Sequence, residues 1–267
     1  MKILNLSATL VVFLSRFARI VAIWVIGILL YQFVLDELIK DDRILLGTLL
    51  FWLLTAYFTL PRLHRFLTRL YLPDYFIGRV RTGDGLLGDP VNIGLLGAKK
   101  ELVAAMHKAG WHQADDLDNR SSLKMVKTSI TGQSYQNAPV SSLFLFGKKQ
   151  DLAFQQEVDG NPRKRHHVRF WRCPQGWVMP GGVRVDWLGA ATYDKSVGLS
   201  LFTLQITHKI AENTDEERDY VLHTLKKHAK ASVHIIKDYS AGYHHRNGGG
   251  DRIKTDGALP VVNLRHK

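Results

Sequence analysis

Cysteine is nearly absent from this chain, because Cys173 is the only one among its 267 residues. A single cysteine cannot form an intramolecular disulfide, and it excludes zinc sites built from cysteine pairs. Because Pro174 follows directly, we interpret Cys173 as a small apolar filler. The lack of cysteine pairs favours a reducing compartment.

Motifs of several common enzyme classes are also missing. The chain has no Walker-type phosphate loop, no G-x-S-x-G and no H-E-x-x-H. The pattern Gly83-x-Gly85-x-x-Gly88 matches a dinucleotide-binding fingerprint, but that motif requires a helix to open at its third glycine. Asp89 and Pro90 follow instead. We therefore interpret this segment as the turn-rich entry to a domain.

Acidic residues are in the minority, with 24 Asp and Glu against 36 Lys and Arg and a formal net charge of +12. Such a charge suits either nucleic acid or an anionic lipid surface. No basic helix or regular basic stripe occurs in residues 82–267. We therefore expect a phospholipid membrane as the partner, and no nucleic acid.

The mean hydropathy of −0.09 conceals two long apolar runs, at 20–35 and 44–60. Each run would form a helix about 25 Å long, slightly short of the ~30 Å hydrocarbon core, and flanking arginines can extend to the headgroups. Residues 1–60 are predicted to form a transmembrane helical hairpin, with spans at about 17–35 and 44–60. The alternative is two buried core helices.

The distribution of Lys and Arg predicts the orientation. Three of them precede the first run, two lie in the loop between the runs, and five lie in residues 61–81. This bias places both termini in the cytoplasm. Residues 61–81 form a basic juxtamembrane connector, for which a short interfacial helix and a continuation of the second span are equally good interpretations.

Residues 82–267 read as a soluble α+β domain. Helical spacing predicts helices at 98–109 and 214–229, and residues 121–131 suit either a helix or a strand. Alternating apolar residues predict strands at 143–146, 152–158, 166–173, 183–193, 199–210, 233–236 and 259–264. The first two strands flank Gly-Lys-Lys-Gln and predict a hairpin. The expected fold class is therefore α+β, with two N-terminal transmembrane helices followed by a largely antiparallel sheet and a few packed helices.

The start of the 214–229 helix carries a recognisable local signal. Thr214 and Glu217 have the spacing of a capping box, and Asp215 suits the positive end of the helix dipole. We interpret Thr214, Asp215 and Glu217 as a structural helix cap. Asp215 and Arg218 are three residues apart and can pair on the helix surface.

The densest polar segment is Arg163–Trp171. On a strand, His167 and Arg169 share one face while His166 lies on the other. The guanidinium group of Arg169 can donate two parallel hydrogen bonds to an anion, so these side chains are candidates for anion binding. The alternative is a strand whose charged side chains simply face solvent.

Asp194 ends a predicted strand of small and apolar residues, where its carboxylate can project into a cleft. His208 suits either a hydrogen-bonded core residue or an acid–base group. The candidate catalytic residues are therefore His167, Asp194 and His208, and the candidate anion-binding residues are Arg169, Arg218 and His166. These histidines with Asp194 and Asp215 also suit zinc or manganese, but their spacings match no ligand motif, so metal and cofactor stay unknown.

Several segments together resemble a known family. They are GDPVNIGLLG (88–97), SSLFLFGKKQDLAFQ (141–155), RHHVRFWR (165–172), WLGAATYD (187–194), HKIAENTDEERD (208–219) and RNGGGDRIKTDG (246–257). In this order they resemble the LssY-type C-terminal domain over residues 82–264. The resemblance implies a bacterial membrane protein, often joined to membrane domains of phosphatidic-acid-phosphatase type, and it implies no established reaction.

These observations predict a two-pass protein of the bacterial inner membrane whose LssY-like domain, residues 82–267, lies in the cytosol. We expect an accessory or binding domain that engages anionic lipid headgroups or envelope membrane proteins. The alternative is a hydrolase of a phosphorylated, membrane-derived substrate. It would use His167 or His208 as acid or base, Asp194 as orienting carboxylate, and Arg169 and Arg218 as phosphate clamp. That hypothesis requires the catalytic side chains to lie within about 10 Å of one another.

Overall fold

The computed structural model describes residues 25, 28, 29, 31, 32, 44–71, 76–115, 135, 137–240 and 242–265. The chain divides into two units, Met1–Phe58 and Thr59–Lys267. The first predicted span, at about 17–35, lies almost entirely outside the described residues, and the segment 121–131 lies wholly outside them.

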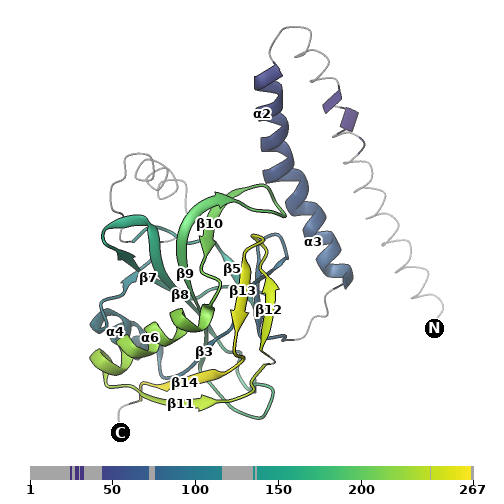
Figure 1. Ribbon diagram of the computed structural model, residues 1–267. Coiled ribbons are helices and arrows are strands. Elements are labelled where there is room, and N and C mark those ends of the chain that lie inside the picture. Colours follow the sequence, from purple (N-terminus) through teal and green to yellow (C-terminus); the bar gives the residue numbers. More distant parts are fainter. Residues whose placement is uncertain are drawn as a thin grey trace, which may run out of the picture. The chain divides into compact units, whose positions relative to one another are not determined.

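Three helical elements follow one another without an intervening loop: α2 (Ile44–Leu54), the π-helix η1 (Thr55–Thr59) and α3 (Leu60–Tyr71) (Figure 1). The π-helical turn ends at Thr59, two residues before Pro61, whose ring nitrogen has no hydrogen to donate, and a wider turn accommodates the missing bond. Within the described residues, Ile44–Leu67 is the one helix long and apolar enough to cross a membrane, with a mean hydropathy of 1.8. The first part of the connector is helical, because α3 follows η1 directly and ends at Tyr71.

The main sheet of the second unit has the strand order β11-β14-β3-β9-β8-β7-β4, with β10 paired to β9. Its strands are β3 (Ile93–Leu96), β4 (His112–Gln113), β7 (Leu152–Val158), β8 (Asn161–Arg172), β9 (Trp187–Leu199), β10 (Ile206–Ile210), β11 (Ser232–Ile236) and β14 (Leu259–Asn263). Only β14 and β3 run parallel; the other neighbouring strands are antiparallel. The predicted α+β class with a largely antiparallel sheet is confirmed.

Two smaller sheets complete the described strands. One has the order β2-β1-β5-β6, and the other is a β12–β13 hairpin. Their strands are β1 (Arg79–Thr82), β2 (Leu87–Pro90), β5 (Leu143–Leu145), β6 (Lys148–Lys149), β12 (Tyr243–Arg246) and β13 (Arg252–Thr255). The glycine pattern at 83–88 forms the turn between β1 and β2 and enters a strand rather than a helix, which confirms that it is no dinucleotide fingerprint.

The predicted hairpin between 143–146 and 152–158 is wrong. Phe146 and Gly147 both have positive φ, 53° and 70°, so the chain reverses within two residues and β5 pairs with β6. Such a two-residue turn matches the twist of antiparallel strands. β7 instead pairs with β8 in the main sheet.

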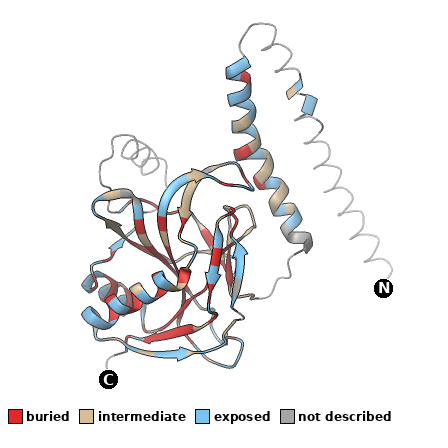
Figure 2. Cartoon of the chain, viewed as in Figure 1, coloured by how far each residue is buried: buried red, intermediate tan, exposed pale blue. Residues whose placement is uncertain are grey.

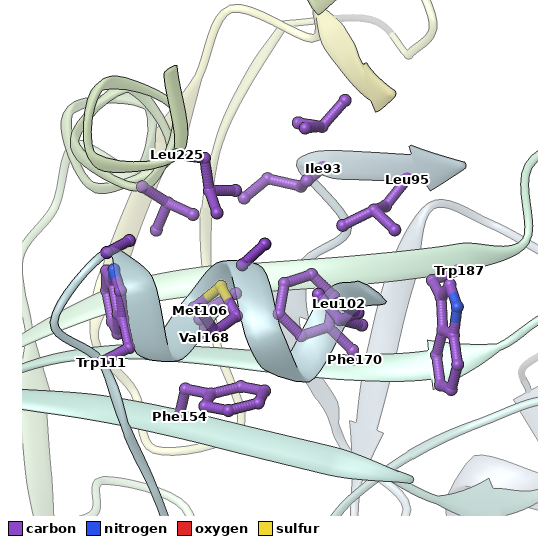
Figure 3. Close-up of a cluster of buried hydrophobic side chains, with 14 of the residues drawn as sticks. Ile93, Leu95, Leu102, Met106, Trp111, Phe154, Val168, Phe170, Trp187 and Leu225 are labelled. Atoms are coloured by element: carbon purple, nitrogen blue, oxygen red, sulfur yellow. The ribbon is translucent and has the colours of Figure 1, made fainter. Parts of the chain in front are cut away.

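Two helices, α4 (Lys99–Lys108) and α6 (Thr214–Ala229), cover one face of the main sheet. Leu102 and Met106 of α4 and Leu225 of α6 meet Phe154 and Phe170 of the sheet in a fully buried core (Figure 3). The predicted bounds of 214–229 are confirmed. Burial follows this arrangement, with buried residues along the strands and on one side of α6 (Figure 2).

A second core lies on the opposite face of the same sheet. It joins Val80 of β1 and Leu143 of β5 to Trp171 of β8 and Leu188 of β9. β8 and β9 are therefore covered on both faces. Where they are covered, successive side chains point alternately into the core beneath the helices and into this second core. The alternative of a solvent-facing β8 is wrong, because its polar residues are largely enclosed.

Candidate functional site

β8 directs three basic side chains to the face opposite the helices. Arg165, His167 and Arg169 alternate along the strand, and all three are buried. Arg165 lies directly across from Asp194 of β9 in the sheet register, so these two side chains share a face. His167 and Arg169 therefore share one face of the strand, as the sequence predicted, and this face is enclosed by the protein.

Asp194 is the centre of this polar group. Its Oδ2 atom lies 3.3 Å from His208 Nδ1, 3.5 Å from His167 Nε2 and 3.8 Å from an Arg165 guanidinium nitrogen. We call Arg165, His167, Arg169, Asp194 and His208 the Asp194 cluster. The three candidate catalytic side chains thus meet the geometric requirement of about 10 Å, although their role stays a prediction.

Arg165 determines which tautomer His208 adopts. The Arg165 guanidinium group lies 3.0 Å from His208 Nε2, and a guanidinium can only donate, so Nε2 accepts. The proton of the neutral ring is then on Nδ1, which faces Asp194. Burial, followed by the charges of Arg165 and Arg169, lowers the pKa of His208 to about 4. His208 is therefore neutral at pH 7.

Burial also governs the other two titratable groups. It raises the pKa of Asp194 to about 7, against the attraction of Arg165 and Arg169. Burial lowers the pKa of His167 well below its ordinary value, and the neighbouring arginines add to this effect. Near neutral pH, the cluster thus holds neutral imidazoles beside a carboxyl group that readily exchanges a proton.

Five buried polar atoms of the cluster have no hydrogen-bond partner among the described residues. They are Arg165 Nε, His167 Nε2, Arg169 Nε, Asp194 Oδ2 and His208 Nδ1. A buried polar atom without a partner costs about 1–3 kcal/mol, so native interiors rarely leave one unpaired. Three of the five face one another at 3.3–3.5 Å, and together with the two arginine Nε groups they make this cluster the candidate site for a polar ligand.

The edge of the cluster is formed by Asp89 of β2 and a glycine-rich loop. Asp89 lies 3.6 Å from Arg169 and shares a side-chain hydrogen bond with Asn247. Asn247 Oδ1 accepts from the backbone N–H groups of Gly249 and Asp251, which folds the loop tightly. The sequence reasoning did not select Arg165 or Asp89. Residues 165, 167 and 169 are spaced two apart and must face the same side of a strand, so this spacing could have identified Arg165 as a member of the cluster. Nothing in the local sequence identifies Asp89.

His166 faces the helices instead. Its Nδ1 lies 2.7 Å from Glu217 Oε2 of α6, and its ring stacks on Tyr220 at a centroid distance of 4.0 Å. Successive residues of a strand alternate, so His166 cannot join His167 on the other face. The structure does not bring this anion-binding candidate to the Asp194 cluster.

Arg218 is also separate from the cluster in its contacts. Its guanidinium group pairs with Asp215 at 3.2 Å, as predicted, and with Asp219 and Asp256, both at 2.8 Å. These bonds tie α6 to the segment after β13. Three carboxylates already surround Arg218, so little of its charge is left for an external anion.

The predicted capping box is wrong by one residue. Asn213 is the N-cap, with extended backbone angles and a side chain that accepts from the Asp215 N–H. Thr214 lies inside the helix and donates to the Lys254 carbonyl, while Glu217 binds His166. An asparagine oxygen caps at least as well as a threonine hydroxyl, and tertiary partners take the other two side chains.

No group of three or more metal-ligating side chains suited to an ion occurs within the described ranges. Asp215 and His166 lie outside the Asp194 cluster, engaged with Arg218 and Glu217. Inside the cluster, the Arg165 guanidinium group lies beside both Asp194 and His208, where a cation would be repelled.

The fold and the cluster define an α+β domain with an enclosed polar cluster, in a chain whose described residues also include one helix long and apolar enough to span a membrane. A family model described as LssY C-terminus matches residues 69–259, more than half of the chain. The chain belongs to this family. Comparison with curated proteins and with solved structures finds no match.

Proposed function

We propose that the LssY domain binds the phosphate group of an anionic, membrane-derived ligand at the Asp194 cluster. The observation that carries this proposal is the set of unpartnered buried atoms contributed by Arg165, His167, Arg169, Asp194 and His208. A phosphate group offers several strong acceptor oxygens, which suit two guanidinium groups. Asp194, with a pKa of about 7, can bind a proton and avoid repelling the anion.

A lipid headgroup is the favoured source of that phosphate. The net charge of +12 attracts the chain to anionic lipid, and Ile44–Leu67 can anchor it in a bilayer. We further propose the two-pass arrangement in the bacterial inner membrane, with both termini cytoplasmic and envelope membrane proteins as neighbours. The Lys and Arg bias supports this topology. A fluorescent-protein fusion at the C-terminus should fluoresce in the cytosol, and a periplasmic C-terminus would contradict it.

Calorimetric titration of the full chain in detergent tests the binding site. A short-chain phosphatidic acid should bind, whereas the matching phosphatidylcholine should bind at least ~10-fold more weakly, because the choline group covers the phosphate. Arg165→Gln should lower affinity for phosphatidic acid by ~10-fold or more, since one charged hydrogen bond contributes about 1.5–3 kcal/mol. The matched control is Arg172→Gln, an exposed arginine on the same strand. Equal binding of the two lipids, or equal effects of the two variants, would refute the proposal.

Hydrolysis of a phosphate ester is the second candidate function. It is favoured by the position of His167 Nε2, 3.5 Å from Asp194 Oδ2, together with the raised pKa of Asp194. In this mechanism, neutral His167 takes a proton from a water molecule as its oxygen attacks phosphorus. The ester P–O bond breaks, and protonated Asp194 gives its proton to the leaving alcohol.

Release of inorganic phosphate from phosphatidic acid tests this second function. The wild-type chain should release phosphate, and His167→Gln should abolish release while Arg172→Gln retains it. If the wild-type chain binds phosphatidic acid but releases no phosphate, binding stands and hydrolysis is excluded.

A further inference from the structure

The end of β9 and the turn that leads from it to β10 expose an unusual group of apolar side chains. Val197, Leu199, Leu201, Phe202 and Leu204 are between 40% and 62% exposed. They occur within eight consecutive residues, and we call them the β9–β10 apolar turn. A contiguous apolar surface on a soluble domain generally marks a contact with a membrane or a partner.

The backbone of this turn is firmly built. Ser200 N–H donates to the Gln205 carbonyl at 2.8 Å, and Leu204 N–H donates to the Ser200 carbonyl at 3.1 Å. Ser200 Oγ accepts from the Thr203 N–H, and both of these polar residues are buried. Polar side chains therefore point inward and apolar ones outward, the reverse of an ordinary surface turn.

The glycine-rich loop holds the turn in place. Leu201 N–H donates to the Gly249 carbonyl at 3.1 Å, and Lys209 Nζ donates to the same carbonyl while pairing with Asp251 at 3.2 Å. The apolar side chains are thus presented on a supported scaffold. Their outward position is part of the fold at this edge of the sheet.

The charge around the turn favours an anionic lipid surface as its occupant. No Asp or Glu occurs from Lys195 to Ile210, and Lys195 is exposed. Apolar tips flanked by lysine suit the boundary between acyl chains and anionic headgroups. The same chain contains the candidate span Ile44–Leu67, which would tether the domain that carries this turn to a bilayer.

The turn is continuous with the Asp194 cluster. His208 follows the turn on β10, and its side chain is 32% exposed, whereas those of Arg165, His167 and Asp194 are each 4% exposed. We propose that the β9–β10 apolar turn inserts into the bilayer interface and thereby holds the His208 side of the cluster at the headgroups. Insertion itself stands independently; delivery of a headgroup to the cluster rests on the proposed function.

Depth-dependent fluorescence quenching tests the insertion in the full chain, reconstituted in anionic proteoliposomes. Cys173→Ala removes the native thiol, and Leu201→Cys or Leu199→Cys then carries an environment-sensitive fluorophore. The matched control is Lys226→Cys, an exposed position on α6. We expect spin-labelled lipid to quench the turn labels at least twofold more than the control label, and aqueous iodide to quench them less.

Stronger quenching of the turn labels by iodide than by lipid would overturn the proposal. So would protection from both quenchers, because the turn would then be covered by protein, such as a second copy of the chain. Adding Arg165→Gln to the labelled chain separates the two ideas. Unchanged lipid quenching with lost phosphatidic acid binding supports both, whereas lipid quenching with intact phosphatidic acid binding retains insertion and rejects the site.

Discussion

Replacing Asp194 by asparagine should stabilise the folded domain above neutral pH and keep its phosphate binding, because asparagine is neutral like the protonated carboxyl group. Asp194 is only 2% exposed, and burial raises its pKa from 3.8 to about 7. The folded state therefore binds the Asp194 proton more tightly than the unfolded chain does. The resulting stability is fully present below about pH 4 and is lost as the pH rises through about 7.

The size of this effect follows from the shift in pKa. At 1.36 kcal/mol for each unit, the change from 3.8 to about 7 corresponds to about 4 kcal/mol above pH 7. Asparagine has nearly the same shape and cannot ionise, so Asp194→Asn should recover up to that amount at pH 8. In a domain of this size, about 4 kcal/mol corresponds to ~8–16 °C in Tm.

His208 gives the variant a characteristic pH profile. Its pKa is lowered to about 4, so its contribution to stability is present above its ordinary pKa of 6.5 and is lost as the pH falls toward 4. On acidification of the wild-type chain, this loss of stability from His208 opposes the gain of stability from protonation of Asp194. Asp194→Asn removes the gain, so the variant should become less stable on acidification through that range.

Thermal unfolding of both proteins in the same detergent, between pH 5 and pH 8, measures these differences. The tryptophan near-UV circular dichroism signal reports tertiary structure. A variant that is no more stable than wild type at pH 8, or whose profile runs parallel to wild type, would refute the assigned protonation of Asp194. Phosphatidic acid titration of the same samples at pH 8 should show binding by the variant that is at least as strong as that of the wild-type chain.

Two further changes separate structural roles from the site. Arg218→Met should destabilise the domain by about 2–3 kcal/mol, because it removes the pairs with Asp215 and Asp256, yet leave phosphatidic acid affinity unchanged; a loss of affinity in still-folded protein would return Arg218 to the site. Leu225→Ala removes a fully buried side chain between α6 and the sheet and should cost about 2–5 kcal/mol in urea denaturation. A cost below ~1 kcal/mol would show that α6 packs differently.

Local sequence patterns predicted correctly those elements that are stabilised by residues within their own segment. The helix at 214–229 was predicted to its bounds, because its apolar spacing and acidic first turn lie within its own sequence. Its cap was misassigned, since Asn213 and Thr214 are both good capping residues and only the backbone angles distinguish them. The hairpin was predicted wrongly because phenylalanine rarely adopts a positive φ, so the sequence does not mark Phe146 as a turn residue.

Strand alternation carried part of the site prediction. It separated His166 from His167 correctly, because successive side chains of any strand face opposite ways. It could not show that β8 lies in the middle of the sheet with both faces covered, since strand order depends on pairing between distant segments. The same limit hid the contact of Asp89 with Arg169 and of Glu217 with His166.

The sequence by itself determined the apolar N-terminal part, the basic charge, the α+β class and the family, because composition, periodicity and ordered motifs are properties of the linear chain. Tertiary structure alone decided which polar side chains meet. Arg165, Asp194 and His208 come from three different strands, and only the β8–β9–β10 register brings them to one enclosed point. Their altered pKa values then arise from burial between two layers, a property of no single residue.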